Sequence, residues 1–364
     1  MFRTSNAPGP ARLANAGEDY ARLGTEPGAI KPWEDGLRTD GGPGTYEWWY
    51  FDAHLADGAK LVLVFSTKEF TDIDRPLTPA IRIDLTLPNG TTLRKLVELD
   101  PKTFTASTDT CDVRIGENVF AGDLHTYTIR ARVEDVEIDV TLSGQVPAWR
   151  PETGVFLFGQ REEHYFAWLP SVPRGRVEAT YSVGGRSRIT TGIGYHDHNW
   201  GNASMPKLMH HWYWARGAAG PYSVIASYIT AEKAYGYSAL PVFMLTRDGK
   251  LVADDGTRIA FEELGRYTDT ETGKPVGNVT RYTYTDGNER YVVTFSRHAD
   301  LAAAKMVDDL KGPKKIGAKL IGFDGAYLRF AGELRVERYQ GEQLVESHTD
   351  DALWELMYFG KARH

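Results

Sequence analysis

The residues best equipped for chemistry lie in one stretch, Gly194 to Asn202. The stretch has β-forming sequence on both sides, so we expect a strand whose side chains alternate between two faces. One face then carries a phenol, a carboxyl and an amide, and the other carries two imidazoles and an indole: Tyr195, Asp197 and Asn199 on the first, His196, His198 and Trp200 on the second. A carboxyl on a sheet face is costly to bury unless it is hydrogen-bonded or used. This strand is therefore the first candidate for an active site.

The pair His196 and His198 also suggests a metal site, because His-x-His places two imidazoles on one face of a strand. Zinc usually needs a third protein ligand, and His210 and His211 are the nearest candidates in sequence. The chain has no cysteine pair and no His-Glu-x-x-His motif to supply that ligand. We therefore favour histidines that bond to backbone and acidic groups, and we predict no metal and no cofactor.

Familiar catalytic motifs are incomplete in this chain. Gly236-Tyr237-Ser238 lacks the second glycine of a nucleophile elbow, and Cys111 has no base beside it in sequence. Gly192-Ile193-Gly194 lacks the third glycine and the βαβ context of a dinucleotide site. Hydrolase and dehydrogenase functions are therefore disfavoured.

Composition favours an all-β protein with large apolar pockets. Of 364 residues, 41% are hydrophobic and 12% aromatic, with nine Trp and nineteen Tyr, and strands and apolar ligand sites both favour aromatic rings. The net charge of −7 argues against a nucleic-acid partner. The one basic run, Lys311 to Lys319, is interpreted as a solvated connection.

The chain start has no apolar signal region, and no stretch is long and apolar enough to span a bilayer. The single cysteine, Cys111, fits a reducing compartment. We therefore expect a cytoplasmic protein without a transmembrane segment, and leave peripheral membrane contact open.

Periodicity predicts mostly short strands and few short helices. An irregular N-terminal arm over residues 1–44 is expected to hold at most a short helix near Ala14–Leu23. An aromatic strand then leads to a turn and an apolar strand, and the same pattern restarts near residue 210, so we predict two β-domains, 45–205 and 206–364. Strands are predicted at Thr45–Asp52, Leu61–Phe65, Ile81–Leu87, Tyr127–Val133, Val136–Leu142, Val155–Leu169, Val177–Val183, Val224–Ile229 and Tyr327–Glu337. A helix is predicted at Asp300–Leu310, and Asp350–Phe359 is left as strand or helix.

Four motifs in order make the chain resemble the carotenoid 1,2-hydratase (hydroxyneurosporene synthase) family, which shades into AttH-type lipocalin-like proteins and lipocalin-like Diels–Alderases. These are Glu-Trp-Trp-Tyr at 47–50, Trp-x-Pro followed by Pro-Arg-x-Arg-Val-Glu at 168–178, Gly-Tyr-x-Asp-His-Asn-Trp-Gly at 194–201, and Trp-Tyr-Trp at 212–214. The resemblance spans roughly residues 45–360. It implies two lipocalin-like β-barrel or sandwich domains with a hydrophobic substrate in a pocket between them.

The resemblance also implies catalytic residues. Hydratases of this family use a His-x-Trp pair and a Tyr-x-Asp pair, which match Trp168, Tyr195 and Asp197 here, while the family histidine position is Phe166. His164, two residues earlier on the same strand face, is the candidate replacement. The departure at Phe166 favours a substrate other than a carotenoid. Further substrate-binding candidates are Phe166, Trp48, Tyr50, His198, Trp200, Trp212, Trp214, Tyr228 and Trp354.

The expected chemistry is acid-catalysed addition to a C=C bond of an isoprenoid or polyene, by hydration or cyclisation. Asp197 would protonate the alkene because burial raises a carboxyl pKa, and aromatic faces would stabilise the cation. Tyr195 and His164 would orient the acid or act as the returning base. Two alternatives stay open: a cofactor-free pericyclase acting on a linear polyene, and a non-catalytic carrier of a hydrophobic ligand.

Overall fold

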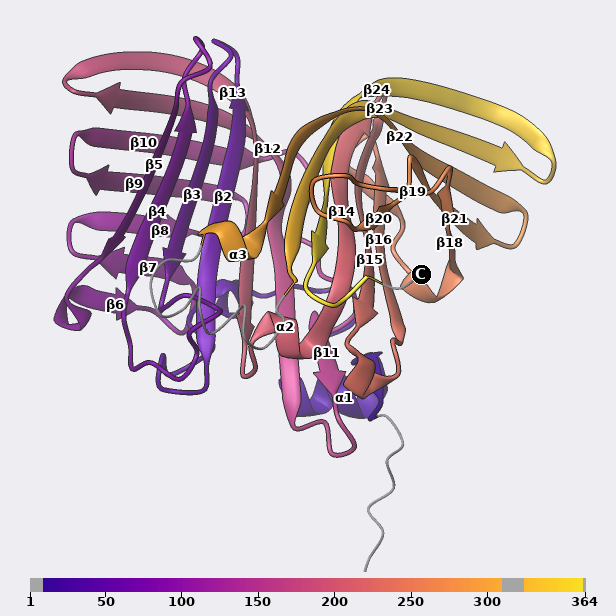
Figure 1. Ribbon diagram of the computed structural model, residues 1–364, viewed down its shortest axis with the longest axis horizontal. Helices are drawn as coiled ribbons and strands as arrows, with labels where there is room; N and C mark the ends of the chain where they lie inside the picture. Colours follow the sequence, from indigo (N-terminus) through magenta and orange to yellow (C-terminus); the bar gives the residue numbers. More distant parts are fainter. Residues whose placement is uncertain (1–8, 310–323, 363–364) are drawn as a thin grey trace, which may run out of the picture. The chain divides into compact units, whose positions relative to one another are not determined.

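The structure is a computed structural model that describes residues 9–309 and 324–362 (Figure 1). The chain forms two compact units. The first unit comprises Leu13–Leu157 and Glu163–Met205, and the second comprises Pro206–His364 together with Met1–Arg12 and Phe158–Glu162. One cut therefore falls between Met205 and Pro206, while two short segments from earlier in the chain belong with the second unit.

The first unit is built on one large antiparallel sheet whose strand order is β5-β4-β3-β2-β13-β12-β10-β9-β8-β7-β6, with β11 paired to β12 and β1 paired to β11. The strands are β1 Ala11–Leu13, β2 Tyr46–Leu55, β3 Lys60–Ser66, β4 Ala80–Thr86, β5 Thr92–Glu98, β6 Phe104–Ala106, β7 Cys111–Ile115, β8 Asn118–Gly122, β9 Thr126–Val133, β10 Val136–Gly144, β11 Val155–Phe158, β12 His164–Val183 and β13 Arg186–Gly201. Three short helical segments join them: α1 Gly17–Leu23, η1 Pro32–Asp35 and η2 Pro101–Thr103.

The second unit repeats the plan with a nine-stranded antiparallel sheet of order β17-β16-β15-β14-β24-β23-β22-β21-β18 and a separate pair, β19-β20. Its strands are β14 Met209–Ala219, β15 Tyr222–Ala231, β16 Ala239–Arg247, β17 Lys250–Ala253, β18 Ile259–Leu264, β19 Tyr267–Thr268, β20 Pro275–Val276, β21 Val279–Asp286, β22 Glu289–Lys305, β23 Ala326–Gln340 and β24 Gln343–Tyr358. Its short helical segments are α2 Met205–Leu208, η3 Lys233–Tyr235, η4 Gly256–Arg258 and α3 Met306–Asp309.

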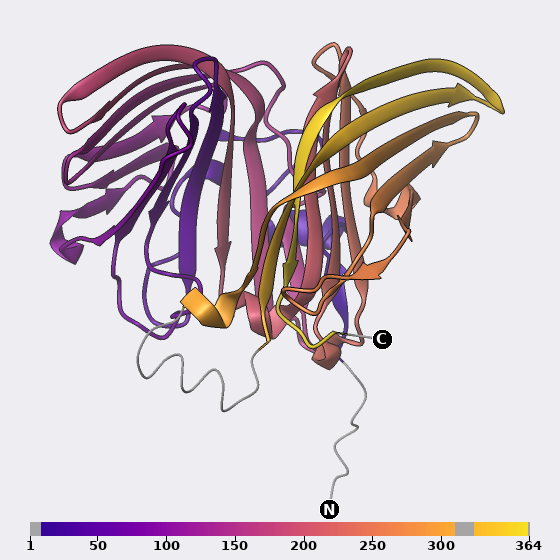
Figure 2. The same ribbon diagram turned by 45° about the horizontal axis from the view of Figure 1, so that its top comes forward.

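Each sheet curves so that its inner face encloses a core of its own (Figure 2). Strand β2 shows the pattern: Trp49, Phe51 and Ala53 lie in the core, while Trp48 and Tyr50 alternate to the other face and are only half-buried. The second core is the more aromatic, and Tyr213, Tyr282, Phe295 and Trp354 are among its members. The predicted all-β, lipocalin-like architecture is confirmed.

One local prediction needs correction. Asp300–Lys305 continues strand β22 instead of forming the predicted helix, and only Met306–Asp309 is helical. The alanine-rich sequence favours a helix locally, but β22 pairs along its length with β23, and sheet pairing overrides propensity. Leu310 and the basic run Lys311 to Lys319 lie outside the described residues.

The remaining predicted strands are present, with Val155–Leu169 divided between β11 and β12. The C-terminal segment left open as strand or helix is strand β24. The N-terminal arm holds α1 and η1, and it places Asp35 at the centre of the first unit's polar core. Among the helices of the described part of the chain, none has both the length and the apolarity to cross a membrane.

Leu63→Ala is expected to lower the free energy of unfolding of the first unit by about 2–5 kcal/mol, because Leu63 is fully buried and truncation leaves a cavity. Urea unfolding followed by tryptophan fluorescence measures this. The matched control is Ile189→Ala on the same sheet, where the side chain is 86% exposed and the change should stay within about 0.5 kcal/mol. Equal losses in the two variants would contradict this assignment of the core.

Candidate active site

Strand β13 carries the candidate site and lies between β12 and β2. In the antiparallel register with β2, Tyr195 is opposite Asp52, Asp197 opposite Tyr50, and Asn199 opposite Trp48. Directly opposed residues share a face of the sheet, so these six side chains form one surface. The predicted alternation along β13 is therefore what the structure shows.

Three side chains donate hydrogen bonds to the carboxyl of Asp197. Trp168 Nε1 and Tyr195 Oη both donate to Oδ2, at 2.8 and 2.7 Å, and Asn199 Nδ2 donates to Oδ1 at 2.7 Å. Asp197 itself is 8% exposed, and its three partners are buried as well. The structure thus brings together three of the four predicted catalytic residues, Asp197, Tyr195 and Trp168.

Burial raises the pKa of Asp197 above its ordinary value. The hydrogen bonds from Tyr195, Trp168 and Asn199 stabilise the carboxylate and act in the opposite direction, but desolvation is the larger effect. An ionised carboxylate has about four acceptor positions. Three are filled here, so one position on Oδ1 is left for a proton or a ligand.

Trp149 extends the aromatic surface beside Asp197 and was missed by the sequence analysis. Its ring meets that of Trp168 edge to face, with ring centres 6.3 Å apart. Its indole nitrogen is buried without a hydrogen-bond partner among the described residues, which is unusual for a donor. Trp149 lies in the loop before β11, outside the four family motifs, so only its residue type could have drawn attention to it.

His164 lies away from the acid. It begins β12, four residues before Trp168, so the two Cα atoms are about 13 Å apart along the strand. Phe166 is opposite Gly201, the last residue of β13, and stacks on Phe156 with ring centres 5.8 Å apart. His164 is therefore too far from Asp197 to act in place of the histidine that the resemblance puts at position 166.

Two further candidates from β2 lie on the Asp197 face. Tyr50 meets Tyr195 edge to face at 6.2 Å and donates a hydrogen bond to Asp52 Oδ2 at 3.0 Å. Trp48 stacks on Tyr46 at 5.4 Å. Both are half-buried and present aromatic surface beside the acid.

His198 and Trp200 lie on the opposite, inward face of β13. The ring of His198 stacks on Trp49, with ring centres 4.7 Å apart, and is tilted against Trp200, with ring centres 4.6 Å apart. His198 Nε2 is 2.8 Å from Glu47 Oε1. His198 is therefore enclosed in the core of the first unit and does not share a surface with Asp197.

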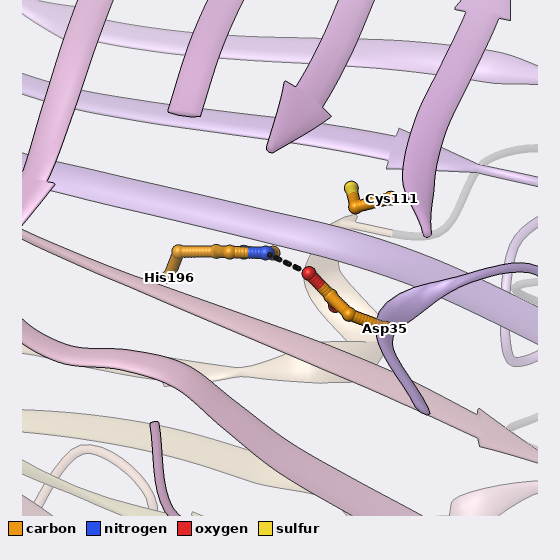
Figure 3. Close-up of side chains that lie close together, drawn as sticks. All are labelled: Asp35, Cys111 and His196. Atoms are coloured by element: carbon orange, nitrogen blue, oxygen red, sulfur yellow. Dashed lines mark hydrogen bonds and ion pairs between the residues drawn. The ribbon is translucent and has the colours of Figure 1, made fainter. Parts of the chain in front are cut away.

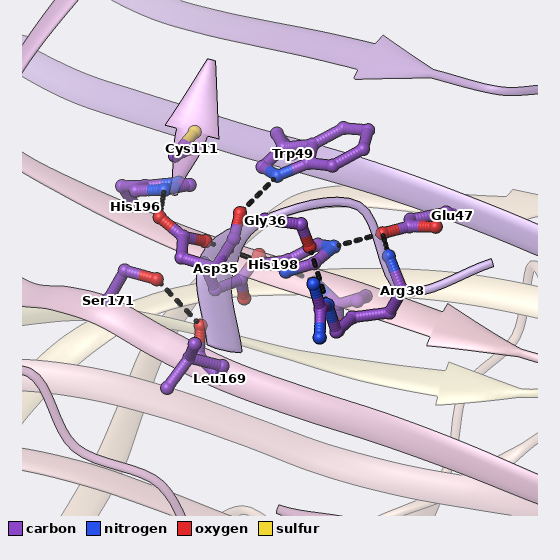
Figure 4. A network of polar contacts seen from close by, with 12 residues as sticks. Asp35, Gly36, Arg38, Glu47, Trp49, Cys111, Leu169, Ser171, His196 and His198 are labelled. Atoms are coloured by element: carbon purple, nitrogen blue, oxygen red, sulfur yellow. Dashed lines mark hydrogen bonds and ion pairs between the residues drawn. The ribbon is translucent and has the colours of Figure 1, made fainter. Parts of the chain in front are cut away.

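The inward face of β13 meets a buried polar network that sequence reasoning did not assemble (Figure 4). His196 Nε2 is 3.2 Å from Asp35 Oδ2, which also accepts a hydrogen bond from Tyr127 Oη at 2.5 Å. Glu47 accepts hydrogen bonds from the backbone of Arg38 and Thr39. Burial acts to raise the pKa of Asp35, but His196, His198 and Tyr127 together bring it below its ordinary value. The predicted bonding of the two histidines to acidic and backbone groups is present, with Asp35 and Glu47 as the acids.

The last four substrate-binding candidates belong to the second unit. Trp354 is buried in its core against Phe295 and Phe330, and Tyr228 stacks on Phe261 at 4.1 Å. Trp212 and Trp214 alternate with the buried Tyr213 on β14, so they lie on the outer face of that sheet. These four side chains therefore divide between the two faces of one sheet.

The fold and site define the class: an all-β lipocalin-like protein with a buried, hydrogen-bonded aspartate on an aromatic sheet face. A family model for Diels-Alderase-like proteins matches residues 42–301, well over half of the chain. The chain belongs to the Diels-Alderase-like family, which is a family of enzymes.

Two curated relatives are similar to parts of the chain. The quinolone epoxide rearrangement protein asqO of Emericella nidulans is 26% identical over 195 residues, which is 50% of this chain and 53% of the relative. The quinolone epoxide rearrangement protein penF of Penicillium thymicola is 24% identical over 180 residues, which is 48% of this chain and 44% of the relative. The chain thus matches about half the length of each.

Three solved structures share the fold. CghA, crystallised with Sch210972, has a TM-score of 0.60 at 15% identity and covers 100% of this chain and 97% of its own. The AttH-type protein of Nitrosomonas europaea has a TM-score of 0.57 at 15% identity, covering 91% and 97%. Kievitone hydratase of Nectria haematococca has a TM-score of 0.53 at 12% identity, covering 97% and 98%. The expected membership of the AttH and Diels–Alderase group is confirmed.

Tyr195→Phe is expected to destabilise the first unit by about 1.5–3 kcal/mol, because it removes a hydrogen bond to a buried carboxyl. Urea unfolding measures the loss. The matched control is Tyr50→Phe, which removes the hydrogen bond from a half-buried phenol to Asp52 and should cost about 0.5–1.5 kcal/mol. A smaller loss in Tyr195→Phe than in the control would contradict the network described around Asp197.

Proposed function

We propose that this protein is an enzyme of natural-product metabolism that adds a proton to a hydrophobic polyene or isoprenoid and so promotes its hydration, cyclisation or rearrangement. Asp197 is the proposed acid. The observation that carries the proposal is the buried Asp197 carboxyl, fixed by Trp168, Tyr195 and Asn199. No cofactor is required for this chemistry.

Protonation of an unactivated alkene gives a carbocation, so the acid must hold its proton until the substrate is in place. Burial opposes ionisation of Asp197, and the three donors leave one acceptor position on Oδ1 where that proton would reside. The fixed hydrogen bonds also orient the carboxyl before the substrate arrives, so little reorganisation remains in the reaction. Tyr195 and Trp168 are positioning residues in this scheme.

The aromatic surface beside the acid suits a carbocation. Trp168, Trp149 and Tyr195 lie next to the carboxyl or to one another. Each ring facing a cation contributes about 0.5–2 kcal/mol of stabilisation. The same surface would fold a linear substrate by apolar contact, so hydration and cyclisation differ only in which nucleophile captures the cation.

The names of the relatives support an acid-catalysed reaction that could be either a rearrangement or a hydration. An epoxide, like an alkene, opens on protonation, and asqO and penF are named as quinolone epoxide rearrangement proteins. The hydratase among the solved structures shares the fold. The finer proposal of a carotenoid-type hydratase is weakened by Phe166 at the family histidine position and by the distance of His164 from Asp197.

A pericyclase is the second candidate, and Trp149 favours it. Its buried, unpartnered indole N–H lies beside Trp168, and such a donor can polarise a carbonyl oxygen on a dienophile. The enzyme would then hold a linear polyene in a reactive shape without moving a proton. Family membership is compatible with both candidates.

Asp197→Asn is expected to lower turnover by about 10²–10⁴-fold and to leave substrate affinity within a few-fold, because the amide keeps the shape but has no acidic proton. Turnover is measured by product formation from a panel of linear isoprenoids, polyenes and epoxides, and affinity by quenching of tryptophan fluorescence. The matched control is Asp52→Asn, a second carboxyl on the same face, which should keep activity. Full activity in Asp197→Asn removes the acid proposal.

Product formed in D₂O is expected to carry one deuterium at the protonated carbon if Asp197 acts as an acid, because the carboxyl proton exchanges with solvent. Mass spectrometry of the product measures the incorporation. For an alkene substrate, product without solvent deuterium assigns the pericyclase instead; an epoxide is protonated on oxygen and is not used in this test. Tight binding with no product after long incubation across the whole panel would assign a carrier.

A further inference from the structure

The inner face of the first unit holds a group of metal-ligating side chains that the proposed reaction does not use. Asp35, Cys111 and His196 each offer one ligand atom, and these three atoms lie within 4.8 Å of one another (Figure 3). They come from three separate parts of the fold: η1, β7 and β13. All three side chains are buried. They lie on the face of β13 opposite to Asp197, because the strand alternates.

Hydrogen bonds fix which nitrogen of each histidine carries its proton. His196 Nδ1 is 2.8 Å from the carbonyl oxygen of Tyr50, which can only accept, so Nδ1 is protonated. His198 Nε2 is 2.8 Å from Glu47 Oε1, and that carboxylate already accepts from the Arg38 backbone, so Nε2 is protonated. In the neutral form of each ring, the other nitrogen has no proton and carries a lone pair.

Both lone pairs face the same carboxylate. His196 Nε2 is 3.2 Å from Asp35 Oδ2, and His198 Nδ1 is 3.5 Å from Asp35 Oδ1. Within the described residues, His198 Nδ1 and Asp35 Oδ1 are buried and have no hydrogen-bond partner. A buried carboxylate that faces two imidazoles is stabilised by positive charge between them, and a divalent cation supplies that charge.

We propose that a divalent transition-metal ion of the zinc class binds here, held by Asp35, Cys111 and His196, with His198 facing the same carboxylate. Ligand atoms bound to one zinc ion at about 2.0–2.3 Å lie about 3.3–3.8 Å apart, which is close to the 3.2 Å between His196 Nε2 and Asp35 Oδ2. The hydrogen bond to Tyr50 is the outer contact that orients a metal-bound imidazole. A thiol at the same point favours zinc over magnesium or calcium.

The proposed site is structural. The three ligands are all buried and join three separate parts of the fold, as ligands of a structural metal do. The ion would tie the N-terminal segment at Asp35 to strand β13 and, across the sheet order, to Cys111 on β7. It would therefore hold β13 in place without taking part in the reaction at Asp197. His210 and His211, the third-ligand candidates nearest in sequence, belong to the second unit.

The full chain, purified without a histidine tag or chelator, is expected to carry about one zinc per chain by elemental analysis. Replacing zinc with Co²⁺ should give tetrahedral visible bands and a thiolate-to-cobalt charge-transfer band. Because the chain has one cysteine, that band can arise only from Cys111. A strong chelator should lower the melting temperature of the holoprotein, and added zinc should restore it.

Cys111→Ser should lose the charge-transfer band and bind Co²⁺ at least about tenfold more weakly, and His196→Gln should bind it more weakly as well. The matched control is His125→Gln, an exposed histidine, which should keep both band and stoichiometry. Circular dichroism establishes that each variant is folded.

A folded wild-type chain that carries no zinc and gives no thiolate band with Co²⁺ overturns the proposal. Metal retained at full stoichiometry in both Cys111→Ser and His196→Gln would place it elsewhere and also overturn the proposal. Asp197→Asn should keep its metal, so this proposal and the proposed function fail independently.

Discussion

The stability of the first unit depends on finding hydrogen-bond or ion-pair partners for the polar side chains that strand β13 buries. Strand β13 has neighbours on both sides, so every side chain must lie on one face or the other. Its central residues place one carboxyl on one face and two imidazoles on the other face, and all three groups are buried. Buried polar groups without partners are costly, so each face needs its own set of partners.

The two faces meet this requirement in different ways. Around Asp197, neutral donors surround one carboxyl. Around His196 and His198, two carboxylates face two imidazoles. The proposed acid and the proposed metal ligand His196 thus occupy adjacent positions in sequence and opposite faces of the sheet.

The comparisons concern the scaffold that carries both faces. The family match includes the whole of β13 and β12, and the solved structures share the fold at identities where only architecture can be compared. A sheet scaffold of this kind can keep its core while the residues around the acid change with substrate. Phe166 lies on β12, the strand next to β13, and the Trp168–Asp197 hydrogen bond is present beside it.

Much of the fold and part of the site could be predicted from sequence, because both depend on short-range periodicity. Alternation alone assigned Tyr195, Asp197 and Asn199 to one face and the histidines to the other, and aromatic strand starts marked both β-domains. Where local preference and sheet pairing disagreed, as at Asp300–Lys305, pairing prevailed because β23 supplies hydrogen bonds that a short helix cannot match.

Only the tertiary structure decided which distant side chains meet. Asp35 comes from a segment with no regular pattern, Cys111 from a strand far from β13 in the sheet order, and Trp149 from a loop. Their positions follow from how the sheet curves and which segments fill its interior, and sequence periodicity carries no information about contacts over such separations. The sequence determined which residues each face of β13 presents, and the fold determined what each face encounters.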